Sequence, residues 1–313
     1  MKIVLILLIA ATMVAAISYL IANYLVYVIL DRNGKHKEST DVLSKDPEEV
    51  KRGIRLICGS EEWQNEFSDK CEVWTIKSKD GLNLKARFIK SESHNYAIVC
   101  HGFTGKYTEV LGRAEHFYKQ GFSVLAPDAR AHGESEGQYR GMGWLEIEDI
   151  KLWIEKIIEL DEQAKILLFG QSMGAATVIN VAGEKLPDNV NVVVEDCSYT
   201  SVWDEFAGQI GVRYHLPAFP IMHLADRICK KKAGYSFREA SPLNQISKCN
   251  LPILLIHGEE DSFVPCDFVH QLYEKATEPK EKLVVAGAGH CMAVARNEKL
   301  YWSTIDNFVG KYI

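Results

Sequence analysis

Ser172 lies between two glycines in the segment "GQSMG", residues 170–174, directly after the apolar run 165–170. An apolar run of this length predicts a buried strand, and the residues that follow Ser172 suit a helix. Glycines two positions before and after Ser172 remove the Cβ atoms that would collide in a tight strand-to-helix turn. Such a turn holds the hydroxyl of Ser172 above the edge of a sheet, where it can act as a nucleophile.

A serine nucleophile also needs a histidine base and a carboxylate that orients the histidine. His290 lies just beyond the apolar run 282–287, and we predict that it is the base. Asp261 lies in the loop after the apolar run 252–258, and we predict that it is the orienting acid. The three residues occur in the chain order serine, acid, histidine, which is the order expected when the serine occupies a strand-to-helix turn.

Other acids could take the place of Asp261. Glu259 and Glu260 precede it directly, and Asp196 ends a predicted strand of its own. An aspartate at this position could also serve as a helix N-cap or a turn residue. Among the rivals, Asp196 is the first to test, because the carboxyl ends of parallel strands are where catalytic groups gather.

The segment "VCHGFTG", residues 99–105, also follows an apolar run, and its glycines let the backbone curl toward Ser172. In acyl transfer the developing oxyanion must be met by fixed hydrogen-bond donors. We predict that the backbone N–H groups of Phe103 and Met173 are these donors; the alternative for this segment is an ordinary loop. Three other histidines precede glycine and are predicted to be structural hydrogen bonders: His101, His132 and His257.

Short apolar runs separated by helix-length segments predict a mostly parallel sheet that is covered by helices. Two alternating segments precede these runs and predict an antiparallel hairpin, at 72–78 and 82–90. The apolar runs lie at 96–100, 122–127, 165–170, 190–196, 252–258 and 282–287. One helix is predicted from apolar residues at helical spacing, which are Ile150, Trp153, Ile154, Ile157 and Ile158.

Residues 199–242 are too long for an ordinary connection between a strand and a helix, and they predict an inserted lid. Four of its apolar side chains are candidates for a substrate pocket: Phe206, Tyr214, Phe219 and Met222. The alternative is that these side chains only pack the insertion against the domain.

Residues 3–30 contain no charged side chain, and a helix of this length exceeds the thickness of the hydrocarbon core of a bilayer. A cleavable signal peptide has a shorter apolar region that ends in small residues, whereas this run continues well past Ala15 and Ala16. A buried core helix is the other alternative, but no side of this helix is polar enough to face water. We therefore predict an uncleaved, single-pass transmembrane helix.

Charged residues around this helix bear on its orientation. Lys2 precedes the helix, whereas Arg32, Lys35 and Lys37 follow it, so the positive-inside rule favours a cytoplasmic domain. The eight cysteines show no metal-like spacing and are predicted to be buried thiols, which fits the same compartment. With 36 basic against 42 acidic residues and no long basic run, nucleic acid is not an expected partner.

Five segments together resemble the serine α/β-hydrolase superfamily: "HGFTG" (101–105), "DARAHGESEG" (128–137), "GQSMGAA" (170–176), "HGEEDSFVP" (257–265) and "GAGH" (287–290). The resemblance runs from about Val73 to the C-terminus. Within the superfamily the chain is similar to membrane-anchored bacterial hydrolases of esterase or lipase type, related to the Bem46-like group. The "HGFTG" segment also resembles cinnamoyl and feruloyl esterases. Ala131 departs from the pattern, since relatives usually have glycine there.

The resemblance implies an α/β fold with a mostly parallel eight-stranded sheet, helices on both faces and a nucleophile elbow at Ser172. It implies catalysis by Ser172, Asp261 and His290 with no cofactor and no metal. The expected organisation is a transmembrane anchor at 1–30, a linker or tether at 31–70 and a hydrolase domain at 71–313, which contains the lid at 199–242.

The expected function is cleavage of carboxylic esters through an acyl-enzyme on Ser172, with small-molecule or lipid-like esters as substrates. One alternative is a peptidase or amidase, but the prolyl oligopeptidase-like relatives usually add a propeller domain that this length cannot hold. The other alternative is a non-catalytic binding module with a hydrolase fold, in which one of the three catalytic residues is normally missing.

Overall fold

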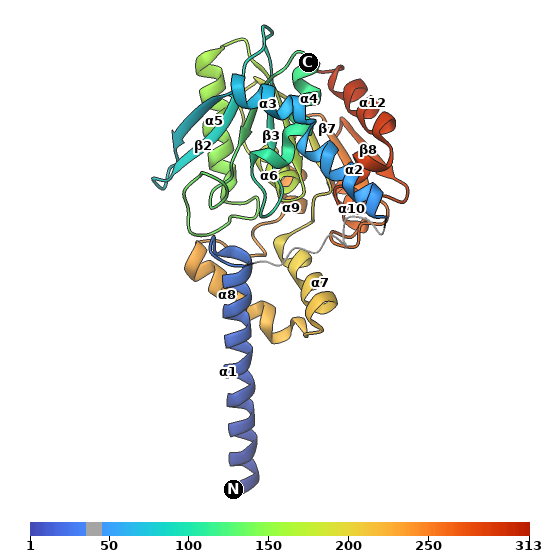
Figure 1. Cartoon of the computed structure of the whole chain (residues 1–313). Helices are drawn as coiled ribbons and strands as arrows, with labels where there is room; N and C mark the ends of the chain where they lie inside the picture. Colours follow the sequence, from blue (N-terminus) through green and yellow to red (C-terminus); the bar gives the residue numbers. More distant parts are fainter. Residues whose placement is uncertain (36–45) are drawn as a thin grey trace.

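One mixed sheet organises the computed structural model, which describes residues 1–35 and 46–313 (Figure 1). Its eight strands lie in the order β1-β2-β4-β3-β5-β6-β7-β8. In chain order they are β1 Glu72–Lys77, β2 Asn83–Ile89, β3 Asn95–Cys100, β4 Ser123–Pro127, β5 Lys165–Gln171, β6 Val190–Asp196, β7 Ile253–Gly258 and β8 Lys280–Val285. Strands β1, β2 and β4 pair antiparallel, and all other neighbours pair parallel.

This topology confirms the predicted α/β fold with an eight-stranded, mostly parallel sheet and an antiparallel hairpin at its start. The last strand begins earlier than the apolar run indicates, at Lys280, which pairs with Ile253. Lys280 and Glu281 can occupy the strand because β8 is an edge strand, where the backbone pairs with β7 while charged side chains reach water.

Helices cover both faces of the sheet. Strand β5 shows how: Ile166 and Leu168 belong to the core on one face, whereas Leu167 and Phe169 belong to the core on the other. The elements that cover the two faces include the 3₁₀ turn Tyr107–Val110, α4 Leu111–Lys119, α5 Glu146–Leu160, α6 Met173–Ala182, α9 Pro242–Ile246, α10 Asp267–Lys275, α11 Ala293–Arg296 and α12 Glu298–Val309.

Helix α5 confirms the helix predicted from apolar spacing. Four of the five residues are buried, and Ile158 is half-buried at the edge of the same face. They form one apolar stripe that packs on the sheet beside β5 and α6.

Residues 46–70 differ from the expected linker, because they fold onto the domain as two helices, α2 Pro47–Cys58 and α3 Glu61–Lys70. Trp63 and Phe67 are only 2% and 1% exposed, and both belong to the core that α4 covers. The indole N–H of Trp63 also donates to the carbonyl of Leu111 at 2.9 Å. Two aromatic residues one helical turn apart bury α3, although its other side chains are mostly polar. The remaining residues of the expected linker, 36–45, lie outside the described residues.

Helix α1, Lys2–Leu30, projects from the domain and contacts it only over its last turns (Figure 1). Residues 3–20 are almost all exposed, whereas Leu25, Val26 and Leu30 are buried. By length and composition α1 can cross a membrane. The insertion at 199–242 contributes the helices that pack on this end of α1, which are α7 Val202–Tyr214 and α8 Ala218–Ala233.

Candidate active site

Ser172 lies at the turn between β5 and α6, in a backbone conformation that L residues rarely adopt (φ 56°, ψ −117°). The flanking glycines are required at this turn. A Cβ atom at Gly170 would lie 2.0 Å from the carbonyl oxygen of Gly174, and one at Gly174 would lie 2.2 Å from that of Cys100. The Ser172 N–H donates to the backbone carbonyl of Asp196 at 2.8 Å, which fixes the turn against the adjacent strand β6.

His290 and Asp261 lie in the loops that follow β8 and β7, and both reach over the same edge of the sheet as Ser172. His290 Nε2 lies 3.0 Å from Ser172 Oγ, and His290 Nδ1 lies 2.7 Å from Asp261 Oδ2. The second oxygen of Asp261 accepts the N–H groups of Phe263 and Val264 at 2.9 and 2.8 Å. The structure therefore brings the three predicted residues into one hydrogen-bonded row.

The charges of this row are set by burial and by each other. Burial raises the pKa of Asp261, but His290 and His257 together outweigh this effect, and the pKa of Asp261 falls below its usual value. Burial lowers the pKa of His290, but the Asp261 carboxylate outweighs it, and the pKa of His290 lies well above its usual value. Asp261 therefore stays ionised and stabilises a positive charge on His290, as is needed when His290 takes the proton of Ser172.

The rival acids lie elsewhere. Asp196 is fully buried, but its Oδ2 accepts the hydroxyl of Tyr301 at 2.7 Å and faces Arg113 at 3.4 Å rather than His290. Glu259 is exposed and accepts the N–H of Gly287 at 3.2 Å, and Glu260 is also exposed. Asp196 is thus part of a buried ion pair.

The three histidines expected to be structural all bond to the backbone. His132 Nδ1 and His257 Nε2 donate to the carbonyls of Arg130 and Val264, each at 2.9 Å, and His101 Nε2 accepts the N–H of Ala129 at 3.0 Å. His257 Nε2 also lies 3.4 Å from Asp261 Oδ2, the same oxygen that His290 contacts.

The segment 101–105 lies beside the nucleophile, as its glycines predicted. A Cβ atom at Gly102 would lie 3.4 Å from the Cβ atom of Ser172, so the backbone leading into Phe103 passes directly over the turn. Met173 is the first residue of α6, and the first N–H groups of a helix lack acceptors within that helix. The positions of both residues fit the predicted oxyanion donors, whose role stays a prediction.

Known proteins resemble this chain over most of its length. The family model described as serine aminopeptidase, S33, matches residues 91–234. The Bacillus subtilis protein YqkD is 30% identical over 243 residues, which cover 76% of this chain and 78% of YqkD. The chain belongs to the serine α/β-hydrolase superfamily.

This hydrolase is also similar to a curated plant protein and to a solved archaeal structure. The α/β hydrolase domain-containing protein WAV2 of Arabidopsis thaliana is 27% identical over 259 residues, 77% of this chain and 79% of WAV2. The solved structure of the Pyrococcus furiosus esterase Pf2001 is 25% identical, with a TM-score of 0.65 over 79% of this chain and 93% of the esterase.

A pocket opens in front of Ser172. It has an empty volume of about 530 Å³, including the space open to solvent, and its walls include Ser172, Met173 and Phe103. Phe206 and Tyr214 of the predicted substrate set line this pocket, and Met222 lines an adjoining one. Phe219 lines neither pocket. It is 73% exposed, because the backbone leaves the helical conformation at this residue and turns its side chain toward solvent.

Glu205 is a pocket residue that the sequence did not single out. It is 4% exposed, lies on α7 among the residues that line the pocket with Ser172, and neither carboxyl oxygen has a hydrogen-bond partner of ordinary geometry among the described residues. Burial is the main reason that its pKa rises to about 8, with the Asp261 charge adding to the effect and His290 opposing it. The sequence signal that could have identified Glu205 is its spacing. It follows the buried Val202 by three residues, which places an acid on the inward face of α7.

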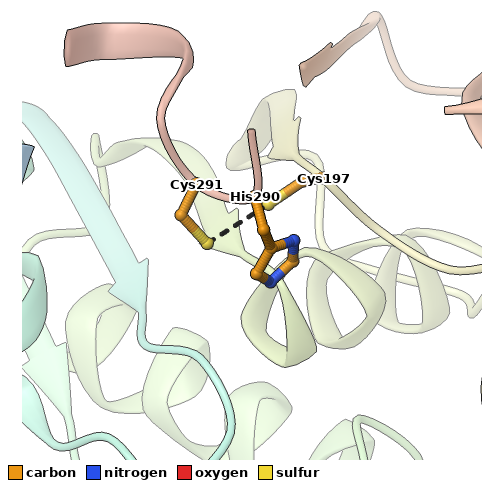
Figure 2. Close-up of side chains that lie close together, drawn as sticks. All are labelled: Cys197, His290 and Cys291. Carbon is orange, nitrogen blue, oxygen red and sulfur yellow. Dashed lines mark hydrogen bonds between the residues drawn. The ribbon is translucent and has the colours of Figure 1, made fainter. Parts of the chain in front are cut away.

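Two thiols pack behind the imidazole of His290. Figure 2 shows Cys197 and Cys291 beside the imidazole, with their sulfur atoms facing each other at 3.4 Å. The hydrogen bond from Cys197, together with the charge of His290, lowers the pKa of Cys291 to about 6 against the effect of burial. Cys197, His290 and Cys291 offer ligand atoms within 4.8 Å of one another. A metal here would displace a hydrogen bond of His290, since both of its ring nitrogens already bond to Ser172 and Asp261.

Proposed function

We propose that this hydrolase cleaves carboxylic esters through an acyl-enzyme on Ser172. The observation that carries the proposal is the hydrogen-bonded row Ser172, His290, Asp261 at 3.0 and 2.7 Å. The largely apolar pocket in front of Ser172 supports an acyl or aryl ester as substrate. The likeness to the Pyrococcus furiosus esterase supports the same class of reaction.

In the proposed mechanism, His290 removes the proton of Ser172 as Oγ attacks the ester carbonyl. The N–H groups of Met173 and Phe103 stabilise the oxyanion, an effect that typically accounts for about 10²- to 10³-fold in rate for each donor. Asp261 holds the imidazole so that Nε2 faces Ser172. His290 then returns the proton to the leaving alcohol and activates the water that releases the acid.

Cleavage of amides is the second candidate. The matching family model is described as a serine aminopeptidase, and the fold also occurs in an acylaminoacyl peptidase of Pyrococcus horikoshii at 18% identity. This chain covers only 44% of that peptidase. We favour esters because the pocket that contains Ser172 adjoins a second apolar pocket, as described below, and an acyl chain could extend from one into the other.

Labelling with a fluorophosphonate tests the nucleophile. We expect the wild type to be labelled and Ser172→Ala to be unlabelled, because the probe reacts with an activated serine. A non-catalytic binding module would leave the wild type unlabelled, and labelling that survives in Ser172→Ala would contradict the assignment. Hydrolysis of p-nitrophenyl acetate, compared with that of an aminoacyl p-nitroanilide, separates esterase from peptidase activity.

We further propose that α1 stays attached and spans a membrane, with the hydrolase domain on the cytoplasmic side and residues 199–242 as a lid. Arg32 and Lys35 after the helix, against Lys2 before it, support this orientation, and Lys37 lies outside the described residues. Cleavage of the domain by a protease added to intact cells would contradict the orientation.

A further inference from the structure

The last turns of α1 are built into the hydrolase domain. Arg140, which is 6% exposed, donates through Nη1 to the carbonyls of Ile29 and Asp31 at 2.7 and 2.9 Å. These are carbonyls at a helix end, which need donors from outside the helix. The same guanidinium lies over the ring of Phe103, 5.2 Å from its centroid. One buried cation therefore joins the end of α1 to the segment beside Ser172.

Two adjoining pockets connect Ser172 with α1. The pocket that contains Ser172 has Ile29 of α1 in its wall. A second, largely apolar pocket of about 400 Å³, including space open to solvent, has Leu25 and Val26 in its wall. The two pockets have four lining residues in common: Ile29, Phe206, Gln209 and Tyr214. The two pockets therefore adjoin each other along these side chains.

The second pocket lies toward the part of α1 that leaves the domain. Leu25 precedes Ile29 by about one helical turn, roughly 6 Å along the axis, in the direction of the exposed residues 3–20. Those residues span about 27 Å, close to the hydrocarbon thickness of a bilayer. If α1 spans a membrane, the second pocket lies next to the bilayer surface.

Exposed apolar side chains lie at the same end of the domain. The lid helices α7 and α8 lie where α1 emerges (Figure 1). The end of α7 exposes Val212 and Tyr214 at 71% and 43%, and the start of α8 exposes Phe219 at 73%. Beyond α1, the other large apolar side chains that are exposed among residues 1–35 and 46–313 are spread over separate elements, at Ile54, Val73, Leu160 and Leu300. Clustered apolar and aromatic side chains beside a membrane helix fit contact with lipid. This contact also gives a place to Phe219, which lines neither pocket.

We propose that α1 forms a wall of the substrate site, and that the substrate is an acyl ester of a membrane lipid whose chain enters from the bilayer along Ile29 and Leu25. The inference rests on the proposed ester hydrolysis and on the proposed membrane insertion of α1. It goes beyond them because α1 takes part in choosing the acyl chain as well as attaching the enzyme.

The test uses the full chain in phosphatidylcholine vesicles, with p-nitrophenyl acetate and with p-nitrophenyl palmitate dissolved in the bilayer. Leu25→Trp fills the second pocket. Ile17→Trp is the control, because it places the same side chain at a position of α1 where the native Ile17 is 52% exposed. We expect the palmitate-to-acetate ratio of kcat/KM to fall at least about tenfold in Leu25→Trp, since a filled pocket rejects extra methylenes. It should stay within about twofold of the wild type in Ile17→Trp.

An unchanged ratio in Leu25→Trp would overturn the inference. A wild type that hydrolyses acetate but leaves palmitate in vesicles intact would also overturn it, while the proposed esterase stands. If the wild type hydrolyses neither ester, the result contradicts the proposed ester hydrolysis itself. If Leu25→Trp loses both esters through misfolding, Ala225→Leu decides, because it narrows the same pocket from α8. A lower ratio in that variant supports the acyl path, and an unchanged one overturns it.

Discussion

Asp261 and Glu205 are two buried acids of one site whose pKa values shift in opposite directions, because their neighbours differ. Asp261 touches His290 and His257 and accepts two backbone N–H groups, so its ionised form is stabilised. Glu205 faces the pocket on the apolar side of α7, so burial favours its neutral form and raises its pKa to about 8. The first acid is suited to hold a histidine, and the second adds no full negative charge to the pocket wall at neutral pH.

Asp261→Asn and Asp196→Asn should differ in kind. We expect Asp261→Asn to lower kcat on the order of 10⁴-fold with little loss of stability, because His290 loses the group that sets its tautomer. Asp196→Asn should instead destabilise the fold by about 3–5 kcal/mol, since it leaves Arg113 buried without its charged partner. Ester turnover and thermal unfolding, measured on both variants, check this. The reverse pattern would move the acid role to Asp196.

Glu205→Gln should change how stability depends on pH. In the folded chain Glu205 keeps its proton up to about pH 8. The unfolded chain, with the usual pKa of 4.5, releases this proton at a lower pH. The stabilisation by the neutral acid is therefore complete below about pH 4.5 and is lost as pH rises through 8. Glutamine stays neutral throughout. We expect equal unfolding temperatures at pH 4.5 and a higher one for Glu205→Gln at pH 8.5; parallel curves would contradict the pKa shift.

At the scale of elements, the strand-to-helix turn depends on close backbone approaches at its two glycines, and the end of α1 depends on a buried hydrogen-bond donor. Gly170 and Gly174 let β5 and α6 meet at Ser172. Arg140 joins the carbonyls at the end of α1 to the ring of Phe103. Helix α3 belongs with these elements, because its two buried aromatic side chains close the core over α4. The domain therefore starts before β1.

Trp63→Ala tests whether α3 is part of the fold. We expect a loss of about 3–5 kcal/mol in the free energy of unfolding, because the indole is 2% exposed and bonds to Leu111. Glu62→Ala, at an exposed position of the same helix, is the control and should change stability by less than about 0.5 kcal/mol. Denaturant unfolding of both variants measures the difference. If Trp63→Ala and Glu62→Ala were equally stable, α3 would add nothing to the fold, as expected of a tether.

The whole molecule combines the apolar helix α1, the insertion at 199–242 and a hydrolase core in one packed unit. The apolar core of the lid, which includes Ile221, Met222 and Ala225, also takes in Leu25 and Val26 of α1. Removing α1 therefore does two things: it removes the exposed part that a membrane would cover, and it uncovers the lid. These effects can be separated, because residues 3–20 are exposed and residues 22–30 are largely buried.

Two truncations follow from this division. A chain that lacks residues 1–20 should keep the stability of the full chain, whereas one that lacks residues 1–30 should unfold at least about 5 °C lower. The second truncation loses the burial of Leu25, Val26 and Leu30, worth roughly 1.5–3 kcal/mol for each side chain. Thermal unfolding and gel filtration in the same detergent check this. Equal unfolding temperatures would show that α1 contributes nothing to the fold.

Local patterns in the sequence already determined much of this protein. The apolar runs placed six of the eight strands, with β8 displaced by two residues, and the alternating segments placed β1 and β2. The spacing of glycines around Ser172 predicted its turn. Their positions after apolar runs made Asp261 and His290 candidates, with Asp196 as a rival acid. Each of these features depends on neighbours in the chain, where periodicity and backbone sterics act directly.

Only the tertiary structure decided which distant groups meet. Asp196 ends β6, and Asp261 lies in the loop after β7. His290, in the loop after β8, bonds to Asp261, whereas Asp196 accepts the hydroxyl of Tyr301 and faces Arg113. The inward side of α7 made Glu205 a pocket residue, and the packing of the lid made α1 a wall of that pocket. Such contacts join residues far apart in the chain, so no local period records them; they form only when the sheet and lid close around the site.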